Sequence, residues 1–481
     1  MKNKVIKSAI WSLIDTFGGF LIKFIFAIWI TRLLTPYDYG LIAYMTIFLS
    51  IGTWISEGGF GTALIQMKKP TDIDFSTSYF FNVAISLLFF FIYLYIAPFV
   101  AIFFNEPELK LIMQIISINL LLNSLHYIHL IKLIKALRFR EQSIINLLSA
   151  FISGFLGLII AYRGFGYWAL VIQLISNSLF RLIGYWIVAK WAPVMVFSIH
   201  SFKEQFYFGY KVFIKGILDS IFKESITIMI GKLHQTSALG NFSRGQKFYD
   251  LFIVQTGIAF NKVLYPSMAE LVDKPERQKD VYIKTYNLLF FLMAPISLFL
   301  FLLSEPIVVV LLTEKWILAA EYFKLFSIVG FIYLLLYYNS TTILSSNNPT
   351  IYLNLDLIQK VLIVVSLLVT YDKGINNIII GWVVVNYIFY FIYEFLMLRM
   401  YFFEKIKYKK IFEVLICLVP QLVVYHVTIL IFHENIWILV MNSMIQPLAY
   451  ILTFRVLKLS MYDDFRKVIR PLLPLKIKWL F

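Results

Sequence analysis

The chain has 481 residues, of which 60% are hydrophobic, 18% aromatic and only 15% charged, and its mean hydropathy is +0.80. Soluble domains have about 45–50% apolar and about 25% charged residues, so this composition excludes a soluble globular protein. The net charge of +16 would suggest a nucleic-acid partner in a soluble protein. Here basic loops that face anionic lipid explain the charge, and no nucleic acid is expected.

Apolar runs separated by short polar breaks predict membrane helices, because one span needs roughly 20 apolar residues. The first span, at 8–31, follows a basic stretch that resembles the start of a signal peptide but has no small-residue cleavage site, so we expect the span to be retained. The breaks after it are expected at 32–38, 68–70, 105–108, 138–141, 163–164, 190–205, 234–247, 266–277, 304–316, 345–349, 371–374, 405–410 and 433–435. The sequence therefore predicts an all-α integral membrane protein with 14 transmembrane helices.

The distribution of Lys and Arg predicts the orientation, since cytoplasmic loops are enriched in both residues. With the N-terminus inside, the cytoplasmic segments carry about 27 basic residues and the outer loops about 8. The eight predicted outer residues are Arg32, Lys110, Arg163, Lys232, Arg244, Lys247, Lys315 and Lys373. We therefore expect both termini in the cytoplasm.

An internal repeat with an offset of 200 residues divides the chain. Lys23 aligns with Lys223, and Gly40 aligns with Gly240. Repeats of this kind are typical of transporters in which two lobes enclose the substrate site. The expected divisions are 1–204 with spans 1–6, 205–401 with spans 7–12, and 402–481 with two further spans and a basic cytoplasmic tail.

Four charged residues follow one another at intervals of four in the seventh span: Lys211, Lys215, Asp219 and Lys223. This spacing places them on one slowly drifting stripe that rises about 18 Å. Charges at such depth are costly in lipid, so they must face a water-filled cavity or one another. In the alternative interpretation, Asp219 pairs with Lys215 and Lys223, and Lys211 reaches the cytoplasmic surface.

Asp15 and Lys23 share one face of the first span, and Lys23 lies too deep to reach the surface easily. Lys23 and Lys223 occupy equivalent positions of the repeat, which would place one lysine on each wall of a central cleft. An anionic ligand would bridge them, and Arg181 in the sixth span would extend the basic surface. The alternative is a structural ion pair of Lys23 with Asp15 or Glu224.

Three carboxylates are candidates for ion coupling: Asp15, Glu57 and Asp219. Glu57 precedes the sequence Gly58-Gly59-Phe60-Gly61, where the glycines should loosen the helix, and a polar helix end is the competing interpretation. Asp356 and Lys360, four residues apart, should form a pair of their own, and Glu394 is expected near the cytoplasmic interface.

Catalytic and cofactor motifs are missing from the sequence. No Walker A, His-Glu-x-x-His or nucleophile-elbow motif is present, so neither catalytic residues nor a cofactor are expected, and ATP hydrolysis by the Walker route is excluded. His126 and His129 lack a nearby third ligand, which favours packing over a metal site. Coupling should therefore use a proton or sodium gradient, or the gradient of the substrate itself.

Several stretches resemble one family. Residues 31–43, TRLLTPYDYGLIA, resemble the first outer loop of Wzx-type polysaccharide flippases. Residues 57–66, followed by Thr71 and Asp74, resemble the second-span signature of the same family. Similar matches lie at 230–232, 239–244 and 265–266, and the resemblance covers the whole chain.

This resemblance implies the multidrug/oligosaccharidyl-lipid/polysaccharide exporter superfamily, and within it the branch that exports O-antigen, colanic-acid-like or teichuronic repeat units. Such proteins have two six-helix lobes, two added C-terminal helices and a cationic central cavity. They carry undecaprenyl-pyrophosphate-linked oligosaccharides across the bacterial inner membrane for surface polysaccharide, including lipopolysaccharide, biosynthesis. The implied partners are this lipid-linked substrate, membrane lipid and, as a further candidate, polysaccharide polymerase machinery.

The residues themselves fit such a substrate. A pyrophosphate carries about two negative charges, which ammonium and guanidinium groups compensate well. The candidate substrate-binding residues are Lys23, Lys211, Lys215, Lys223 and Arg181. A flippase for the lipid-linked peptidoglycan precursor is an open alternative. A cation-coupled multidrug exporter of the same superfamily and a membrane-embedded polymerase or glycosyltransferase fit less well, because the expected cavity is basic and no large polar outer loop or diacid catalytic site is seen.

Overall fold

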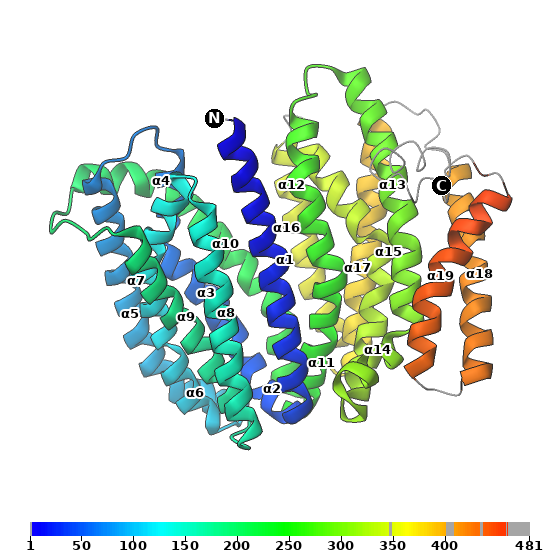
Figure 1. Cartoon of the computed structure of the whole chain (residues 1–481), viewed down its shortest axis with the longest axis horizontal. Coiled ribbons are helices and arrows are strands. Elements are labelled where there is room, and N and C mark those ends of the chain that lie inside the picture. Colours follow the sequence, from blue (N-terminus) through cyan, green and yellow to red (C-terminus); the bar gives the residue numbers. More distant parts are fainter. Residues whose placement is uncertain (1, 346–348, 401–407, 433–435, 458, 460–481) are drawn as a thin grey trace. The chain divides into compact units, whose positions relative to one another are not determined.

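A computed structural model of the protein (Figure 1) describes residues 2–345, 349–400, 408–432, 436–457 and 459, and within these ranges it contains helices and no strand. The first helices are α1 (Lys2–Leu33), α2 (Pro36–Tyr44), α3 (Thr46–Glu57), α4 (Phe60–Gln66), α5 (Asp72–Phe104), α6 (Glu108–Ile116), α7 (Ile118–Lys135), α8 (Phe139–Tyr162), α9 (Trp168–Ala189) and α10 (Ile199–Leu233). The remaining helices are α11 (Thr236–Tyr249), η1 (Asp250–Val254, a π-helix), α12 (Gln255–Ala269), α13 (Pro275–Leu302), α14 (Ser304–Leu312), η2 (Glu314–Trp316, a 3₁₀ turn), α15 (Ile317–Ser345), α16 (Pro349–Thr370), α17 (Ile375–Met400), α18 (Tyr408–Phe432) and α19 (Ile436–Val456).

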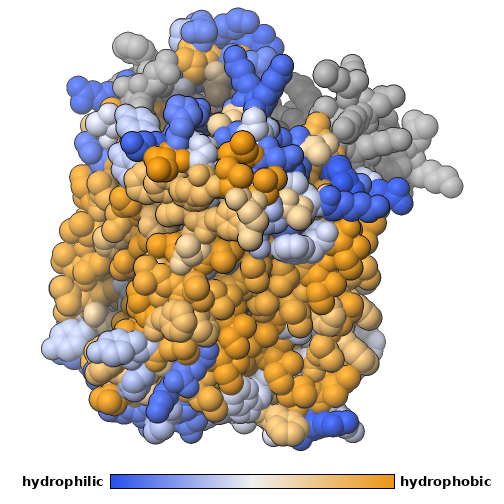
Figure 2. Space-filling model, turned by 90° about the vertical axis from the view of Figure 1, so that its left-hand side faces the viewer, coloured by the Kyte–Doolittle hydropathy of each residue, from blue (hydrophilic) through white to orange (hydrophobic). Residues whose placement is uncertain are grey.

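Many of these helices are suited to a membrane. Within the described ranges, 11 helical segments are long and apolar enough to cross one, or 12 if α2 and α3, bent by 40° at their junction, count as one span. Figure 2 shows the result on one face, where a broad hydrophobic band lies between hydrophilic ends. The protein is therefore an all-helical, multi-pass membrane protein, as the sequence predicts, whereas the expected number of 14 spans is not reached by length and composition alone.

Two segments expected to be loops are helical. The first predicted break, 32–38, contains the start of α2, because the Thr35 side chain accepts a hydrogen bond from the Asp38 backbone while Asp38 accepts one from the Thr35 backbone, and Pro36 occupies the first helical position. The second predicted loop, 234–247, shrinks to two residues before α11 begins at Thr236. The sequence analysis therefore overestimated both outer loops.

Glycines end α3 directly after Glu57, as the sequence predicts. Gly58 and Gly59 both adopt left-handed backbone conformations, with φ angles of 59° and 71°. A Cβ atom at Gly59 would lie 2.3 Å from the backbone oxygen of Gly209 on α10. Glycine is therefore needed twice here, for the turn and for the close approach of α10.

The chain divides into two compact units, residues 1–240 and 241–481. Helix α10, which we expected to open the second lobe, packs against α2, α3, α4 and α5 of the first unit. A stripe of small residues permits this contact, since the buried face of α10 includes Gly209, Gly216 and Ser220. The expected boundary at 204/205 was drawn from the sequence repeat, whereas the compact units are defined by contacts between residues. The boundary between the repeats therefore stays a prediction.

The helix order recurs about 200 residues along the chain. Helix α1 ends at Leu33 and α10 at Leu233, and in both cases the next helix begins three residues later. The nine-residue helix α6 before the long α7 likewise has a counterpart in the nine-residue α14 before the long α15. The secondary structure thus follows the repeat that the alignment of Gly40 with Gly240 indicates.

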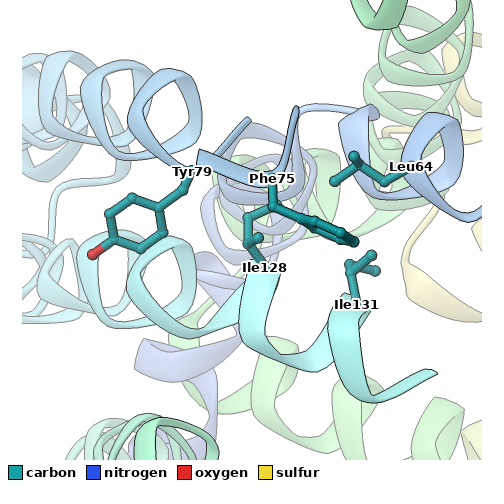
Figure 3. Packing of buried hydrophobic residues seen from close by; sticks show 5 residues of the cluster. All are labelled: Leu64, Phe75, Tyr79, Ile128 and Ile131. Atoms are coloured by element: carbon teal, nitrogen blue, oxygen red, sulfur yellow. The ribbon is translucent and has the colours of Figure 1, made fainter. Parts of the chain in front are cut away.

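An apolar cluster positions the broken helix pair α3–α4 in the first unit. Leu64 of α4 packs with Phe75 and Tyr79 of α5 and with Ile128 and Ile131 of α7 (Figure 3). Lipid tails are as apolar as these side chains, so close van der Waals packing rather than escape from water holds such helices together. The cluster therefore fixes the position of α4 and, through the glycine turn, that of Glu57.

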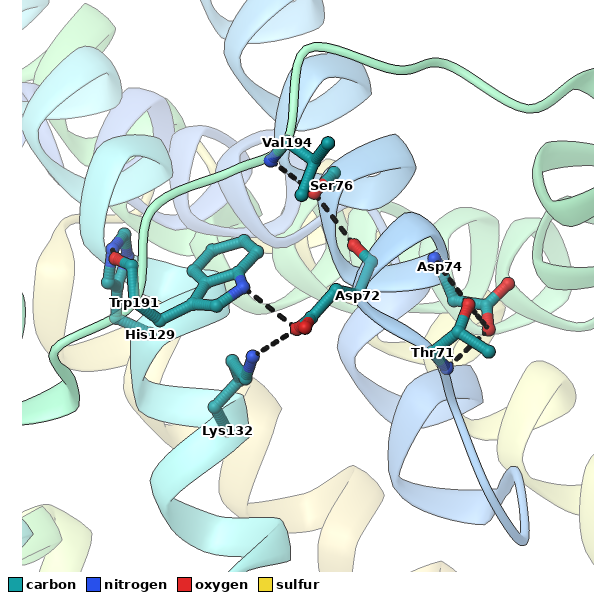
Figure 4. A network of polar contacts seen from close by, with 8 residues as sticks. All are labelled: Thr71, Asp72, Asp74, Ser76, His129, Lys132, Trp191 and Val194. Atoms are coloured by element: carbon teal, nitrogen blue, oxygen red, sulfur yellow. Dashed lines mark hydrogen bonds and ion pairs between the residues drawn. The ribbon is translucent and has the colours of Figure 1, made fainter.

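The linker between α9 and α10 is tied to the first turn of α5 (Figure 4). Asp72 accepts hydrogen bonds from Lys132 Nζ at 2.6 Å and from the Trp191 indole at 3.0 Å. A ring nitrogen of His129 lies 3.1 Å from the Trp191 carbonyl oxygen, so His129 packs as the sequence predicts. The Val194 backbone N–H adds a hydrogen bond to the Ser76 hydroxyl.

Asp74 should matter more to stability than its neighbour Asp72. Its carboxylate accepts hydrogen bonds from the Thr71 backbone at 2.7 Å, the Thr71 hydroxyl and the Ser201 hydroxyl of α10. Asp74→Asn removes a helix cap and an anchor of α10, at an expected cost of about 1–3 kcal/mol, whereas the exposed Asp72–Lys132 ion pair is worth about 0–1 kcal/mol. Thermal unfolding in detergent should therefore show a larger decrease in Tm for Asp74→Asn than for Asp72→Asn, and equal decreases would contradict the assignment.

Candidate functional site

Four of the residues predicted for the site come together inside the first unit and form what we call the N-terminal charge cluster: Asp15, Lys23, Glu57 and Arg181. Lys23 lies within electrostatic reach of both Asp15 and Arg181, and Glu57 within reach of Arg181. Helix α8 brings α1, which carries Asp15 and Lys23, close to α9, which carries Arg181, because it packs extensively against both helices. Gly154 of α8 allows close approach, since a Cβ there would lie 2.4 Å from the Phe26 ring of α1.

A chain of polar side chains connects Asp15 to Arg181. The Asn146 amide nitrogen donates to both Asp15 carboxylate oxygens, at 3.0 and 3.3 Å. The Tyr185 hydroxyl donates to the Asn146 amide oxygen at 2.9 Å, and the Arg181 guanidinium lies 6.0 Å from the centre of the Tyr185 ring. His126 stacks on the other side of this network, with its ring 5.4 Å from that of Tyr185. Asp15 is thus oriented by neutral hydrogen-bonding groups rather than by Lys23 alone.

Arg181 carries an unused hydrogen-bond donor. Its Nε atom is buried and has no hydrogen-bond partner among the residues that the structure describes. A buried donor without a partner costs free energy, and a guanidinium fork matches the oxygens of phosphate and carboxylate groups. The position therefore suits an oxyanion ligand that would satisfy this N–H group.

Glu57 has a neutral partner beside it. The Tyr127 hydroxyl on α7 forms a hydrogen bond with the Glu57 carboxylate. The same hydroxyl lies against Gly61, where an added Cβ would be 2.2 Å away. The glycine turn, Tyr127 and Arg181 together position Glu57.

The α10 stripe, as we name Lys211, Lys215, Asp219 and Lys223, lies outside the packed face of α10. Lys215 Nζ pairs with Asp219 at 2.8 Å, and the two side chains are 49% and 40% exposed. Lys211 lies 5.2 Å above the ring of Tyr207, and Lys223 is exposed and has no ion pair within the described part of the chain. The predicted pairing of Asp219 is therefore confirmed for Lys215 and not for Lys223.

Glu224 takes another role than the one weighed in the sequence analysis. Its buried carboxylate accepts hydrogen bonds from the Thr46 hydroxyl of α3 at 2.9 Å and from Thr227 at 3.2 Å. The bridging of Lys23 and Lys223 by an anionic ligand stays a prediction.

The second unit contains a polar network that the sequence analysis missed. The Asn339 amide on α15 donates to Glu394 of α17 at 3.2 Å, and the Tyr282 hydroxyl of α13 donates to Asn339 at 2.8 Å. Glu394 is thus tied to a neighbouring helix, whereas we expected it only at the interface. Asparagines 146 and 339 escaped notice because a single amide within a span has no periodic or motif signal.

Two other expectations concern charge and metal. Lys360 and Asp356 form the predicted pair, with 2.6 Å between Nζ and the carboxylate oxygen. Among the described residues, no group of three or more His, Cys, Asp or Glu side chains is arranged to hold a metal ion. The expected basic run at 405–410 begins outside the described residues, as does the basic tail at 460–481.

Comparison with known proteins places these features in a family. Residues 29–321, more than half of the chain, match the family of polysaccharide biosynthesis proteins. The chain is 24% identical over 306 residues to the succinoglycan biosynthesis transport protein ExoT of Rhizobium meliloti, covering 64% of this chain and 62% of that protein. It is also 24% identical over 306 residues to the teichuronic acid biosynthesis protein TuaB of Bacillus subtilis, covering 62% of each chain. This chain thus spans about 62% of the length of these two curated relatives.

Solved structures support the same assignment at the level of the fold. The lipid II flippase MurJ in its inward closed conformation superposes with a TM-score of 0.71 at 13% identity, covering 94% of this chain and all of that chain. An inward-facing multidrug resistance MATE transporter of the MOP superfamily superposes with a TM-score of 0.62 at 13% identity, covering 82% of this chain and 98% of that one. At these identities the likeness concerns the fold alone. The family match confirms the resemblance to Wzx-type polysaccharide flippases read from the motifs, and this chain therefore belongs to the family of polysaccharide biosynthesis proteins.

Proposed function

We propose that this protein is a flippase, not an enzyme, and that it carries undecaprenyl-pyrophosphate-linked oligosaccharide repeat units across the bacterial inner membrane by alternating access. Family membership, the names of the relatives and the MurJ-like fold support a transport role in polysaccharide biosynthesis. The observation that carries the substrate assignment is the buried Arg181 Nε, which has no hydrogen-bond partner among the described residues and lies within electrostatic reach of the Lys23 ammonium. These two cations offer a pyrophosphate the charge and the donors it needs.

The proposed architecture has 14 spans. Twelve come from the apolar helices with α2 and α3 counted together, and α10 and the α11–α12 segment would supply the other two. Helix α10 has 35 residues, more than enough to cross the membrane, and its charged stripe accounts for its low apolarity. The divisions 1–204, 205–401 and 402–481 and the cytoplasmic location of both termini belong to this proposal, although residues 1 and 460–481 lie outside the described part.

The proposed substrate site has two parts. Lys23 and Arg181 of the N-terminal charge cluster form one part, and Lys211, Lys215 and Lys223 of the α10 stripe form the other. Lys223 supports this division, because it is exposed and forms no ion pair with another described residue, so it is available for a ligand, whereas Lys215 must share its charge with Asp219. The pyrophosphate would therefore contact Lys23, Arg181 and Lys223 most directly.

Alanine substitution of the lysines tests this site. We expect the triple variant Lys23→Ala/Lys215→Ala/Lys223→Ala to lose at least about tenfold in polymer export at normal membrane abundance, since one charged hydrogen bond is worth about 1.5–3 kcal/mol. The measurement is complementation of a flippase-deficient strain with quantified membrane levels. Lys→Arg at each site should be milder but not silent, because the charge remains while the geometry changes. Normal export by the triple variant would end the proposal.

A structural role for the lysines predicts another pattern. If Lys215 served only to neutralise Asp219, Lys215→Ala would lower protein abundance, and Asp219→Asn in the same chain would restore abundance and export together. A triple variant of three exposed lysines in the predicted outer loops, none of which has a proposed role, is the matched control for net charge: Lys110→Ala/Lys315→Ala/Lys373→Ala. Its export should equal that of the unmodified protein.

Ion coupling is proposed for Asp15, Glu57 and Asp219. Asp15 and Glu57 both lie within reach of a basic side chain in the N-terminal charge cluster, so their ionisation is linked to substrate charge. Asp219 is linked in the same way through Lys215. Reconstituted vesicles given a proton gradient, a sodium gradient or ATP should flip lipid-linked substrate in response to one of the gradients or to neither, and ATP-driven flipping by this chain alone would refute the proposal.

The second candidate function is transport of the lipid-linked peptidoglycan precursor, favoured by the fold of MurJ at a TM-score of 0.71. Both substrates carry a polyprenyl pyrophosphate, so the basic site fits either. Complementation distinguishes them, because a strain depleted of its peptidoglycan-precursor flippase should be rescued only in the second case.

A further inference from the structure

A groove lies between the ends of α1 and α8 in the first unit. Its volume is about 640 Å³, and its lining residues are Ile28, Trp29, Arg32, Leu33, Leu158, Ile159, Tyr162 and Arg163. Six of these eight residues are apolar or aromatic, and the other two are arginines. The lining on each helix covers five residue steps, which correspond to about 7.5 Å of helix rise.

The two arginines lie at the same end of the groove. Arg32 belongs to the last turn of α1, and Arg163 follows the last residue of α8. By the distribution of charge both face the outer side, where basic residues are scarce. Two of the eight basic residues predicted for the outer loops thus share one small groove and make one of its ends basic.

The aromatic residues mark the depth of this groove. The side chains of Trp29 and Tyr162 are 60% and 82% exposed. Trp and Tyr are typical of the region where lipid headgroups meet acyl chains, because each has an apolar body and a polar group. The groove therefore extends from headgroup level about one and a half helical turns into the acyl region, where the first part of an acyl chain would lie.

We propose that this groove binds an anionic phospholipid of the outer leaflet, with its phosphate between Arg32 and Arg163 and the start of an acyl chain against Leu158 and Ile28. A guanidinium fork matches phosphate oxygens, and two arginines favour a net negative headgroup over a zwitterionic one, whose ammonium group they repel. The site lies within one unit and concerns a lipid that stays in its leaflet, so it does not depend on the proposed substrate, whereas its assignment to the outer leaflet rests on the orientation given under the proposed function.

Lipid titration of the purified full-length chain tests this site. Native mass spectrometry of the detergent-solubilised protein would count bound phosphatidylglycerol and phosphatidylcholine at matched concentrations. We expect phosphatidylglycerol to bind about tenfold more tightly than phosphatidylcholine, as a difference of one charged hydrogen bond predicts. Arg32→Gln/Arg163→Gln should abolish this preference, while the matched control Lys110→Gln/Lys373→Gln keeps it.

A second variant tests the apolar part of the groove independently of the two arginines. Leu158→Trp fills the acyl part without changing the charge and should reduce binding of both lipids, and it remains informative if the double arginine variant does not fold. Unchanged binding by Leu158→Trp, or a preserved preference in the double arginine variant, would overturn the proposal. Displacement of phosphatidylglycerol by undecaprenyl phosphate at a lower concentration would overturn it as well, because the occupant would then be the polyprenyl carrier.

Discussion

Arg181→Met should reduce polymer export by at least about tenfold while the protein remains in the membrane, because it removes the guanidinium whose buried Nε would donate to the substrate's pyrophosphate. Methionine has a similar length and no charge, so the packing of α9 is largely preserved. Arg181→Lys keeps the charge but loses the planar fork, and its export should lie between that of the unmodified protein and that of Arg181→Met. Export per unit of membrane protein, measured in a flippase-deficient strain, gives the comparison.

A purely structural Arg181 would behave differently. In that case the guanidinium serves to neutralise Glu57, and Arg181→Met leaves a partly buried carboxylate without compensation. Abundance would fall, and Glu57→Gln in the same chain would restore both abundance and export. Rescue of export by this second substitution would therefore contradict the role of Arg181 in substrate binding, and failure of rescue at normal abundance would support it.

Gly240→Ala should be the most damaging single-methyl substitution in the first unit. A Cβ at Gly240 would lie 1.8 Å from the Pro36 carbonyl oxygen and 2.9 Å from the Gly40 nitrogen. The obstruction is backbone, which cannot rotate away as a side chain can, so we expect a cost at or above the usual 1–3 kcal/mol of overpacking, on the order of 3 kcal/mol. Gly40→Ala should behave similarly, because its Cβ would lie 2.0 Å from the Thr236 carbonyl oxygen.

The contact that these glycines allow joins α2 to α11 at a polar cluster. Tyr37 donates to Glu106 at 2.8 Å, the Thr236 hydroxyl also binds Glu106, and the Tyr44 hydroxyl donates to the Gly231 carbonyl at 3.0 Å. We expect Gly240→Ala to separate these elements, with lower Tm in detergent and lower export.

Gly19→Ala is the matched control for this substitution. It places a Cβ 3.9 Å from the Leu147 side chain, in ordinary contact, and alanine is the better helix former by about 1 kcal/mol. A Gly240→Ala protein that melts and exports as Gly19→Ala does would show that the contact between α2 and α11 is not required.

Local sequence signals determined the helices and most of their boundaries. Breaks expected at 68–70, 138–141 and 371–374 correspond to the ends of α4, α7 and α16, because charged, Pro and Gly residues interrupt apolar runs there. The aligned glycines of the repeat could also be found, since Gly40 and Gly240 need no tertiary information to be matched. The family motifs added the transport class.

The interior of the first unit could not be derived in this way. Asn146 became a partner of Asp15 and of Tyr185, and Tyr127 became a partner of Glu57, only through the packing of α1, α3, α7, α8 and α9. These contacts join residues more than 30 positions apart, and no periodicity within one helix encodes which faces of two helices meet.

The boundary between the compact units is a second feature that the sequence alone did not determine. The repeat indicated a division at 204/205, whereas contact assigns α10 and the start of α11 to the first unit. Composition and periodicity determine which segments are helices and how deep a charge lies in each, because both depend on residues close in the chain. Only the tertiary structure decided which lysine of α10 pairs with a carboxylate. Lys215 pairs with Asp219, whereas Lys223 is exposed and has no ion pair among the described residues. The outcome depends on the orientation of α10 about its axis, which is set by the packing of its small residues against α2–α5.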